Sequence, residues 1–157
     1  MRFCRPSVIR YQRNLSMRGQ CLCGTVAFEV DAASLGLYRC HCSLCRRESG
    51  TASSLAALVP RAQFRWLCGQ DKVASWQKTT GFRSDFCATC GSPVPHPLRT
   101  TSEVWVPAGL FDEPASLQVV ADIYMASKAS WDPSQPIGGQ FLELPAFTEF
   151  LALLHGE

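Results

Sequence analysis

Short stretches that mix apolar and polar positions run through most of the chain, separated by turn-forming residues. The segment 25–30 (TVAFEV) is rich in β-branched and aromatic residues and lies between Gly24 and Asp31, as is typical of a strand. Similar stretches predict strands at 37–39, 54–59, 63–66, 73–78, 82–86, 103–106 and 117–124. Turn signals separate them at Gly36, Pro60, Gly69, Gly81, Gly91 and Gly109. This pattern predicts a mainly β domain of short, mostly antiparallel strands.

The C-terminal residues follow a helical period instead. Phe147, Phe150, Leu151 and Leu154 recur at the spacing of one helix face, and Gly156 suits a helix end. The sequence therefore predicts one short C-terminal helix whose apolar stripe serves packing. It contains no GxGxxG, P-loop or GxSxG motif, so nothing favours a nucleotide-binding protein or a serine hydrolase.

Length and composition favour one domain with a hydrophobic core. The chain has 157 residues, of which 46% are hydrophobic. No apolar run reaches the roughly 18 residues that a membrane span requires, so we expect no membrane partner. Residues 1–16 lack the continuous apolar stretch of a secretory signal. We therefore expect a reducing, cytoplasmic location, where clustered cysteines serve as metal ligands.

The net charge of +2 is unevenly distributed. Residues 1–18 contain five arginines and no acidic residue, which predicts a basic, disordered N-terminal tail. The same residues also fit sequence upstream of a natural start at Met17, or a transit peptide. The predicted domain, 19–157, keeps ten of the 15 basic residues against all 13 acidic ones. A slightly negative domain is a poor candidate for binding nucleic acid.

Seven of the nine cysteines fall into three short motifs. CxC and CxxC spacings let one turn present two thiolates to one ion, and a following glycine permits the tight backbone of a metal knuckle. The motifs are CLCG at Cys21 and Cys23, CHCSLC at Cys40, Cys42 and Cys45, and CATCG at Cys87 and Cys90. They predict Zn²⁺, two ions per chain, with the second site fully or partly occupied.

The simplest division of the seven ligands is four and three. Cys21, Cys23, Cys87 and Cys90 would form a closed structural site, whereas Cys40, Cys42 and Cys45 would leave an open position, as in a catalytic site. The spacing permits other pairings. A second possibility is two structural sites, with His41, Cys68, His96 or water completing the second. A four-thiolate zinc contributes about 10–16 kcal/mol to folding, as much as the whole stability of a typical domain, about 5–15 kcal/mol.

Other uses of these cysteines are less favoured by the sequence. Disulfides within CxC pairs have poor geometry, no thioredoxin-like βαβ pattern surrounds a CxxC motif, and iron–sulfur ligation is a minor alternative. Cys4 and Cys68 belong to no motif and are expected to be thiols. His96, flanked by prolines, and His155, near the chain end, are expected at the surface.

The three cysteine motifs resemble those of the glutathione-dependent formaldehyde-activating enzyme family, also called the GFA or CENP-V domain family. The matching motifs are GxCxCG at 19–24, CHCSxCRxxSG at 40–50 and FCxxCGSP at 86–93, with a looser match, IYMASKASW, at 123–131. The resemblance implies an Mss4-like fold around zinc and the same four-plus-three division of the cysteines. One departure is Asp122, where many relatives carry histidine, which bears on substrate identity.

The resemblance also implies a zinc-dependent carbon–sulfur lyase that handles a thiol–aldehyde adduct such as S-(hydroxymethyl)glutathione. A small thiol such as glutathione would take the open position on the zinc held by Cys40, Cys42 and Cys45. In this hypothesis Arg46, and with it Arg47, would attract a substrate carboxylate, and Ser49 and Gly50 would offer hydrogen bonds. The alternative is a non-catalytic zinc-binding module that acts in protein interaction.

Overall fold

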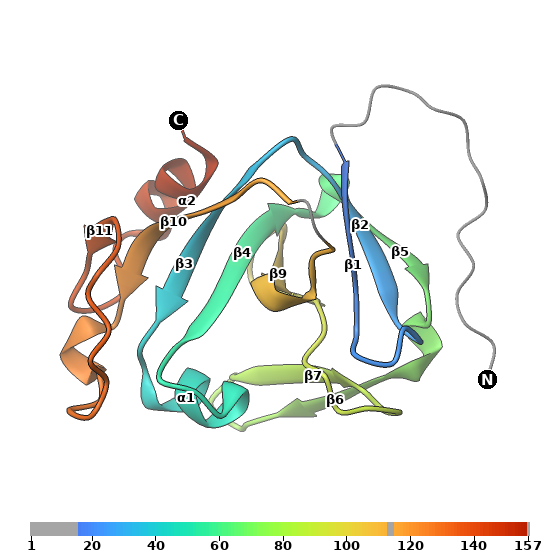
Figure 1. The fold of residues 1–157 in the computed structure, drawn as a ribbon, viewed down its shortest axis with the longest axis horizontal. Helices are drawn as coiled ribbons and strands as arrows, with labels where there is room; N and C mark the ends of the chain where they lie inside the picture. Colours follow the sequence, from blue (N-terminus) through green and yellow to red (C-terminus); the bar gives the residue numbers. More distant parts are fainter. Residues whose placement is uncertain (1–15, 113–114, 157) are drawn as a thin grey trace. The chain divides into compact units, whose positions relative to one another are not determined.

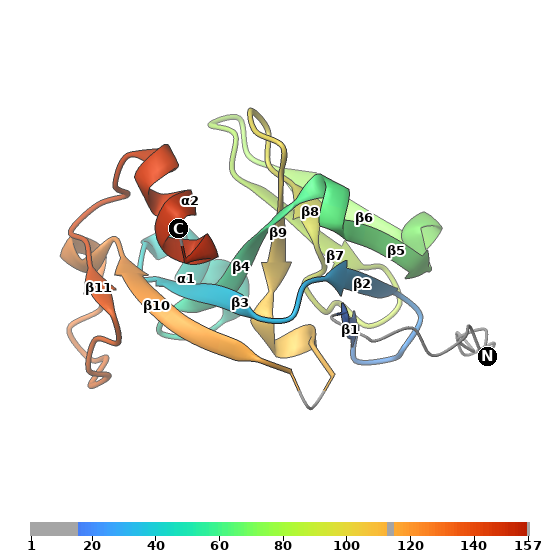
Figure 2. The same ribbon diagram turned by 90° about the horizontal axis from the view of Figure 1, so that it is seen from above.

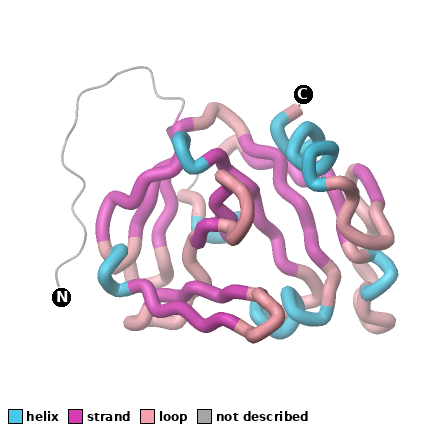
Figure 3. Tube along the Cα trace, turned by 180° about the vertical axis from the view of Figure 1, so that it is seen from behind, coloured by secondary structure: helices cyan, strands magenta, loops and turns pink. Residues whose placement is uncertain are grey.

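The computed structural model describes residues 16–112 and 115–156. Within them it forms eleven strands and two helices, and this confirms the predicted mainly β class (Figures 1 and 3). Most of the expected tail, including Cys4, lies outside the described residues, but Met17 and Arg18 already belong to the first strand. Regular structure is therefore present before Gly19, the predicted start of the domain. No helix among the described residues combines the length and apolar character needed to cross a membrane.

The chain divides into two compact units, each described by itself. The first contains residues up to 34 together with 59–116. Its strands are β1 (Ser16–Gln20), β2 (Ala27–Asp31), β5 (Phe64–Cys68), β6 (Val73–Gln77), β7 (Arg83–Cys87), β8 (His96–Pro97) and β9 (Glu103–Pro107). β1, β2 and β5 form one antiparallel sheet, and β6 and β7 form a hairpin (Figure 1). β8 pairs antiparallel with β9.

Aromatic residues form the core of the first unit. Phe28 on β2 is fully buried, and its ring lies 5.6 Å from that of Phe64 and 5.5 Å from that of Phe111. Gly19 on β1 lies opposite Phe28 in the antiparallel register. A Cβ at this glycine would lie 2.4 Å from the phenyl ring, so the aromatic core needs a residue without a side chain here.

The second unit contains residues 35–58 and 117–156 of the described chain. Its elements are β3 (Leu35–Cys40), α1 (Ser43–Ser49), β4 (Ser54–Pro60, continuing past 58), β10 (Leu117–Ile123), β11 (Gly139–Gln140) and α2 (Phe147–His155). β3 pairs antiparallel with β4 but parallel with β10, and β10 pairs parallel with β11. Antiparallel pairs outnumber these two parallel ones among the described residues, as predicted for a mostly antiparallel arrangement. β3 and β10 are far apart in the chain, so no tight turn forces them to run in opposite directions.

The predicted C-terminal helix is confirmed as α2. It covers β3 and β10 (Figure 2), and its Phe150 ring packs edge-on against Tyr38 at 5.1 Å. Gly156 ends it in the left-handed conformation, with φ of 73°. At Gly36 on β3 a Cβ would lie only 2.3 Å from the Leu154 carbonyl oxygen, so this glycine lets the helix approach the strand.

Candidate metal centres

The first unit brings four of the predicted ligands together. Cys21 and Cys23 follow β1, whereas Cys87 ends β7 and Cys90 lies in the next turn. All four Sγ atoms lie within 4.8 Å of one another, with Cys21 to Cys23 at 3.5 Å and Cys23 to Cys87 at 3.8 Å. A tetrahedral site with Zn–S bonds of about 2.3 Å places its sulfurs about 3.8 Å apart. The donor set therefore fits one tetrahedral, thiophilic ion.

The two halves of this cluster share one backbone design. The N–H of Gly24 donates to the Cys21 carbonyl at 2.9 Å, and the N–H of Gly91 donates to the Cys87 carbonyl at 2.8 Å. Both glycines are left-handed, with φ of 71° and 76°. Glycine adopts this left-handed conformation at little steric cost because it has no Cβ. This is why each motif ends in a glycine.

Polar neighbours support thiolates at the edge of this cluster. The Thr25 hydroxyl lies 3.2 Å from Cys23 Sγ and is the main cause of a lowered pKa for that thiol. Burial opposes ionisation of Cys90, but the hydroxyl and amide of Ser92 outweigh it and lower its pKa to about 6. Burial raises the pKa of Cys21 to about 11, so this sulfur needs a cation to hold it ionised.

Apolar residues cover part of the four-cysteine cluster. Cys21 and Cys87 are buried together with Val26 and Val94, and Trp66, Val73 and Leu110 pack against them, whereas Cys23 and Cys90 are partly exposed. Four converging sulfurs fill a tetrahedral coordination shell and leave no position for a substrate, which is the arrangement of a structural metal site.

The second unit brings together the other three predicted ligands. Cys40 ends β3, Cys42 caps the start of α1 by accepting the N–H of Cys45 at 3.4 Å, and Cys45 lies in the first turn of the helix. Their Sγ atoms lie within 4.8 Å of one another, and no fourth potential ligand joins them among the described residues. Residues 43–49 form a short helix, for which the sequence analysis predicted no regular element.

The thiols of Cys40 and Cys45 influence each other's ionisation. A hydrogen bond from the Cys45 thiol is the largest cause that lowers the pKa of Cys40 to about 7, and the same contact raises the pKa of Cys45. Such a pair titrates as a unit because ionised neighbours repel each other. A divalent cation would remove this repulsion, so the cluster also fits a metal ion.

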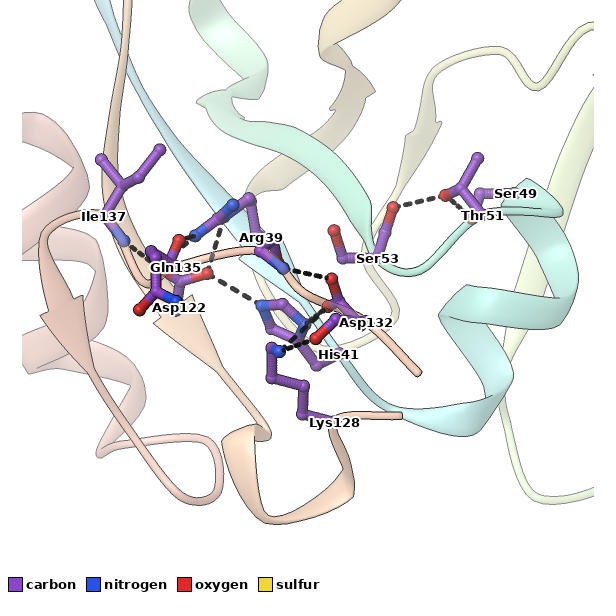
Figure 4. A network of polar contacts seen from close by, with 11 residues as sticks. Arg39, His41, Ser49, Thr51, Ser53, Asp122, Lys128, Asp132, Gln135 and Ile137 are labelled. Atoms are coloured by element: carbon purple, nitrogen blue, oxygen red, sulfur yellow. Dashed lines mark hydrogen bonds and ion pairs between the residues drawn. The ribbon is translucent and has the colours of Figure 1, made fainter. Parts of the chain in front are cut away.

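His41 lies between two of these cysteines but points away from them. The side chain is fully buried, its Nε2 lies 2.8 Å from Asp122 Oδ1, and its Nδ1 lies 3.5 Å from Asp132 Oδ2 (Figure 4). Its backbone N–H donates to the Ile123 carbonyl at 3.0 Å. The imidazole therefore anchors the ligand segment to β10 and does not join the sulfur cluster.

Asp122 is the centre of a buried polar network (Figure 4). Its carboxylate accepts hydrogen bonds from Arg39 at 2.7 and 2.9 Å and from the N–H of Ile137 at 2.7 Å, besides contacting His41. Burial opposes its ionisation, but the hydrogen bonds from Arg39 and His41 outweigh burial and lower its pKa. Asp122 thus holds the segment carrying Cys40 and Cys42.

The expected substrate contacts lie on and after α1. The Ser49 hydroxyl lies 2.9 Å from the Cys45 carbonyl and 2.8 Å from the Thr51 hydroxyl, and Gly50 closes the helix by donating to the Arg46 carbonyl. Ser49 and Gly50 therefore have partners at the helix end. Arg46 is partly buried, and its Nε has no hydrogen-bond partner among the described residues, whereas Arg47 is exposed.

Three other expectations can be compared with the structure. His96 is buried, with 7% of its surface exposed, which corrects the expected surface position. The flanking residues Pro95 and Pro97 are typical of a surface loop, but β8 pairs with β9 and places the His96 ring against that of Trp105. His155 is exposed as expected. Cys68 is disulfide-bonded, so the expected thiol is wrong.

Tyr124 is not among the site residues predicted from the sequence, although it lies in the matching stretch at 123–131. It directly follows Ile123 and is the one non-glycine residue with positive φ, 57°, in the described chain. Burial is the largest cause that raises the pKa of its phenol, followed by the negative charge of Cys40 and Cys42, so the side chain lies near the three-cysteine cluster. A strained backbone beside a reactive cluster is typical of a functional site.

Comparisons with known proteins agree with the motifs. The chain is similar to a crystal structure of a Rhodobacter sphaeroides protein from a structural genomics programme, at 30% identity and a TM-score of 0.51, over 62% of this chain and 89% of that one. No curated protein matches the sequence. A family model described as glutathione-dependent formaldehyde-activating enzyme matches residues 16–127, which include all seven clustered cysteines. The chain therefore belongs to the glutathione-dependent formaldehyde-activating enzyme family.

Proposed function

We propose that this protein is a zinc-dependent, carbon–sulfur lyase-type enzyme that handles a thiol–aldehyde adduct such as S-(hydroxymethyl)glutathione. The three-cysteine cluster carries the proposal, because its sulfurs converge without a fourth ligand among the described residues. Family membership supports the same chemistry. Cys21, Cys23, Cys87 and Cys90 would hold a structural zinc, and Cys40, Cys42 and Cys45 would hold a second one.

A zinc ion held by three thiolates supplies an open position at which an incoming thiol ionises more readily. In the forward reaction the thiol sulfur bonds to the aldehyde carbon, and the thiol proton ends on the former carbonyl oxygen. The reverse reaction breaks the same carbon–sulfur bond. Both directions need the sulfur and the carbonyl carbon to be held in contact, and holding them can lower the barrier by several kcal/mol, about 7–11 in well-oriented systems.

The chain's own residues would position the reactants. His41 and Asp122 hold the segment that carries Cys40 and Cys42 in place. The Tyr124 phenol, with its raised pKa, keeps its proton at neutral pH and would donate a hydrogen bond to the aldehyde oxygen. Arg46, with its unpaired Nε, would meet a carboxylate of the thiol substrate, and Ser49 and Gly50 would lie at the margin of that contact.

We further propose that the protein acts in the cytoplasm on a small thiol, without nucleic-acid or membrane partners. A reducing compartment keeps the clustered cysteines available as thiolates, whereas the disulfide at Cys68 is unusual there. Counting thiols in protein purified and denatured without reductant tests this point. Nine reactive thiols would show that the Cys68 disulfide of the structure is reduced in the cell, as a reducing compartment requires, and a persistent disulfide would contradict the cytoplasmic location.

The decisive experiment combines a metal count with a thiol titration. Protein purified without chelator should contain close to two zinc ions, and cobalt at the second site should change its absorption spectrum when glutathione is added. S-methylglutathione, which lacks the thiol, is the matched control. ¹³C-formaldehyde and glutathione should then give the S-hydroxymethyl adduct faster than without enzyme. If glutathione leaves the cobalt spectrum unchanged and the adduct forms no faster, the non-catalytic zinc module is the better description.

A further inference from the structure

The first unit contains a cavity of about 530 Å³ that the proposed reaction does not use. Its volume falls in the range of sites for small organic ligands, roughly 300–1,000 Å³. From its charges and its aromatic walls we propose that it binds a small aromatic carboxylate. The construction of the cavity walls and the groups that line them support this class of ligand.

One wall is a single face of the β6–β7 hairpin. The antiparallel register places Ser75 opposite Asp85 and Val73 opposite Cys87. Residues two apart on a strand share a face, so Arg83 and Asp85 lie on the same face as the metal ligand Cys87. Val73, Ser75, Arg83 and Asp85 all line the cavity. Val73 also packs against the four-cysteine cluster, as does Trp66, which likewise lines the cavity, so the cluster supports both lining residues.

Arginines give the cavity a positive excess. Its lining contains Arg61, Arg65 and Arg83 but only one acidic residue, Asp85. Asp85 accepts two hydrogen bonds from Arg83, both 2.7 Å long, and Glu29 accepts one from Arg65 at 2.6 Å. These carboxylates fix two guanidinium groups in place. Arg61 is exposed and forms no ion pair among the described residues, so it is the cation available to an incoming anion.

The remaining lining groups favour an organic anion over an inorganic one. Phe64 and Trp66 stand at 90° with ring centroids 5.1 Å apart, and both rings line the cavity. Flat apolar groups pack well against such a corner. His96 is buried with no hydrogen-bond partner for its Nδ1 among the described residues, and burial lowers its pKa to about 4. This neutral imidazole adds a polar contact without adding charge.

Benzoate tests the proposal on the zinc-loaded protein. Its binding is followed by NMR at the Trp66 indole N–H and the Arg83 Nε–H. We expect saturable shifts with a dissociation constant on the order of 1 mM for a ligand of this size. Benzamide, which has the same shape without the charge, and inorganic phosphate, which has charge without the ring, should each bind about tenfold more weakly.

Two arginine variants separate the cavity from general surface charge. Arg61→Gln should weaken benzoate binding about tenfold, because the free guanidinium is lost. Arg99→Gln removes the same charge from an exposed position that does not line the cavity and should bind benzoate like the parent protein. Linear, unsaturable shifts with benzoate, equal binding of benzamide, or an unchanged affinity in Arg61→Gln would each overturn the proposal. Phosphate binding as tight as that of benzoate would overturn the aromatic part and leave a simple anion site.

Discussion

Replacing Asp122 with alanine should damage both the fold of the second unit and its metal site. The carboxylate is fully buried and contacts Arg39, His41 and the backbone of Ile137. Alanine would leave the Arg39 guanidinium, which is only 14% exposed, without its anion. Removing one partner of a buried ion pair costs about 3–5 kcal/mol. That is a large share of the stability of a typical domain, about 5–15 kcal/mol.

Urea unfolding of the zinc-loaded protein measures the first effect. With a urea dependence of about 2 kcal/mol per molar, the midpoint should fall by about 2 M. Glu143→Gln, an exposed carboxylate outside the network, is the control and should leave the midpoint unchanged. Arg39→Ala combined with Asp122→Ala should cost less than the sum of the two single changes, because neither charge is then left alone.

The pH dependence of this effect has a defined sign. The folded pKa of Asp122 lies below its ordinary value of about 3.9, so the stabilisation is complete above that value and is lost only as the pH falls through the folded pKa. The difference between parent and Asp122→Ala should therefore be constant from pH 6 to 8. A difference that changes in this window would show that another group carries the contribution.

The metal site provides the second readout. His41 loses its Nε2 partner in Asp122→Ala, and groups that orient ligands typically affect metal affinity about 10–100-fold. Cobalt titration of the three-cysteine cluster should therefore show weaker binding by that factor, with the four-cysteine cluster unaffected. If Asp122→Ala unfolds like Glu143→Gln and binds cobalt like the parent protein, the network does not position the ligands.

Three further predictions follow from the same geometry. Cys87→Ser should yield insoluble or unfolded protein because it opens the buried cluster, whereas Cys42→Ser should remain folded with about one zinc fewer by metal analysis; equal unfolding of both would refute the four-plus-three division. Gly36→Ala should lower the free energy of unfolding by about 1–3 kcal/mol in urea, since its Cβ would meet the Leu154 carbonyl at 2.3 Å, and an unchanged midpoint would contradict the close contact. Tyr124→Phe should reduce adduct formation about tenfold without changing zinc content, and full activity would exclude the phenol as a donor.

The cysteine motifs could be read from the sequence because their spacing is a local property. Each knuckle is set by two cysteines and a left-handed glycine within a few residues, as at Gly24 and Gly91. Helix α2 could be predicted equally well, because its buried residues Phe150 and Leu154 recur on one helix face. In α1 no residue is buried, so the segment carries no apolar stripe from which a helix could be predicted.

Other features depend on residues far apart in the chain. Asp122 meets His41 and Arg39 only because β10 lies parallel to β3, a pairing with no local signal. His96 is buried by pairing with Trp105, although its flanking prolines resemble a surface loop. Residues 16–18 were assigned to the tail because they end an arginine-rich stretch without acidic residues, although Met17 and Gly19 are buried positions of β1. Sequence patterns of single segments do not contain this information.

The two halves of the four-cysteine cluster also impose an order of events during biosynthesis. Cys23 and Cys87 are 64 positions apart, and at a typical rate of synthesis the second half follows the first after about 3–13 s. Throughout that interval Cys21 and Cys23 are two bare thiols on a growing polypeptide. An ion that needs all four sulfurs can be captured only after Cys90 has left the ribosome, so metal loading of this cluster would be a late step in the maturation of the protein.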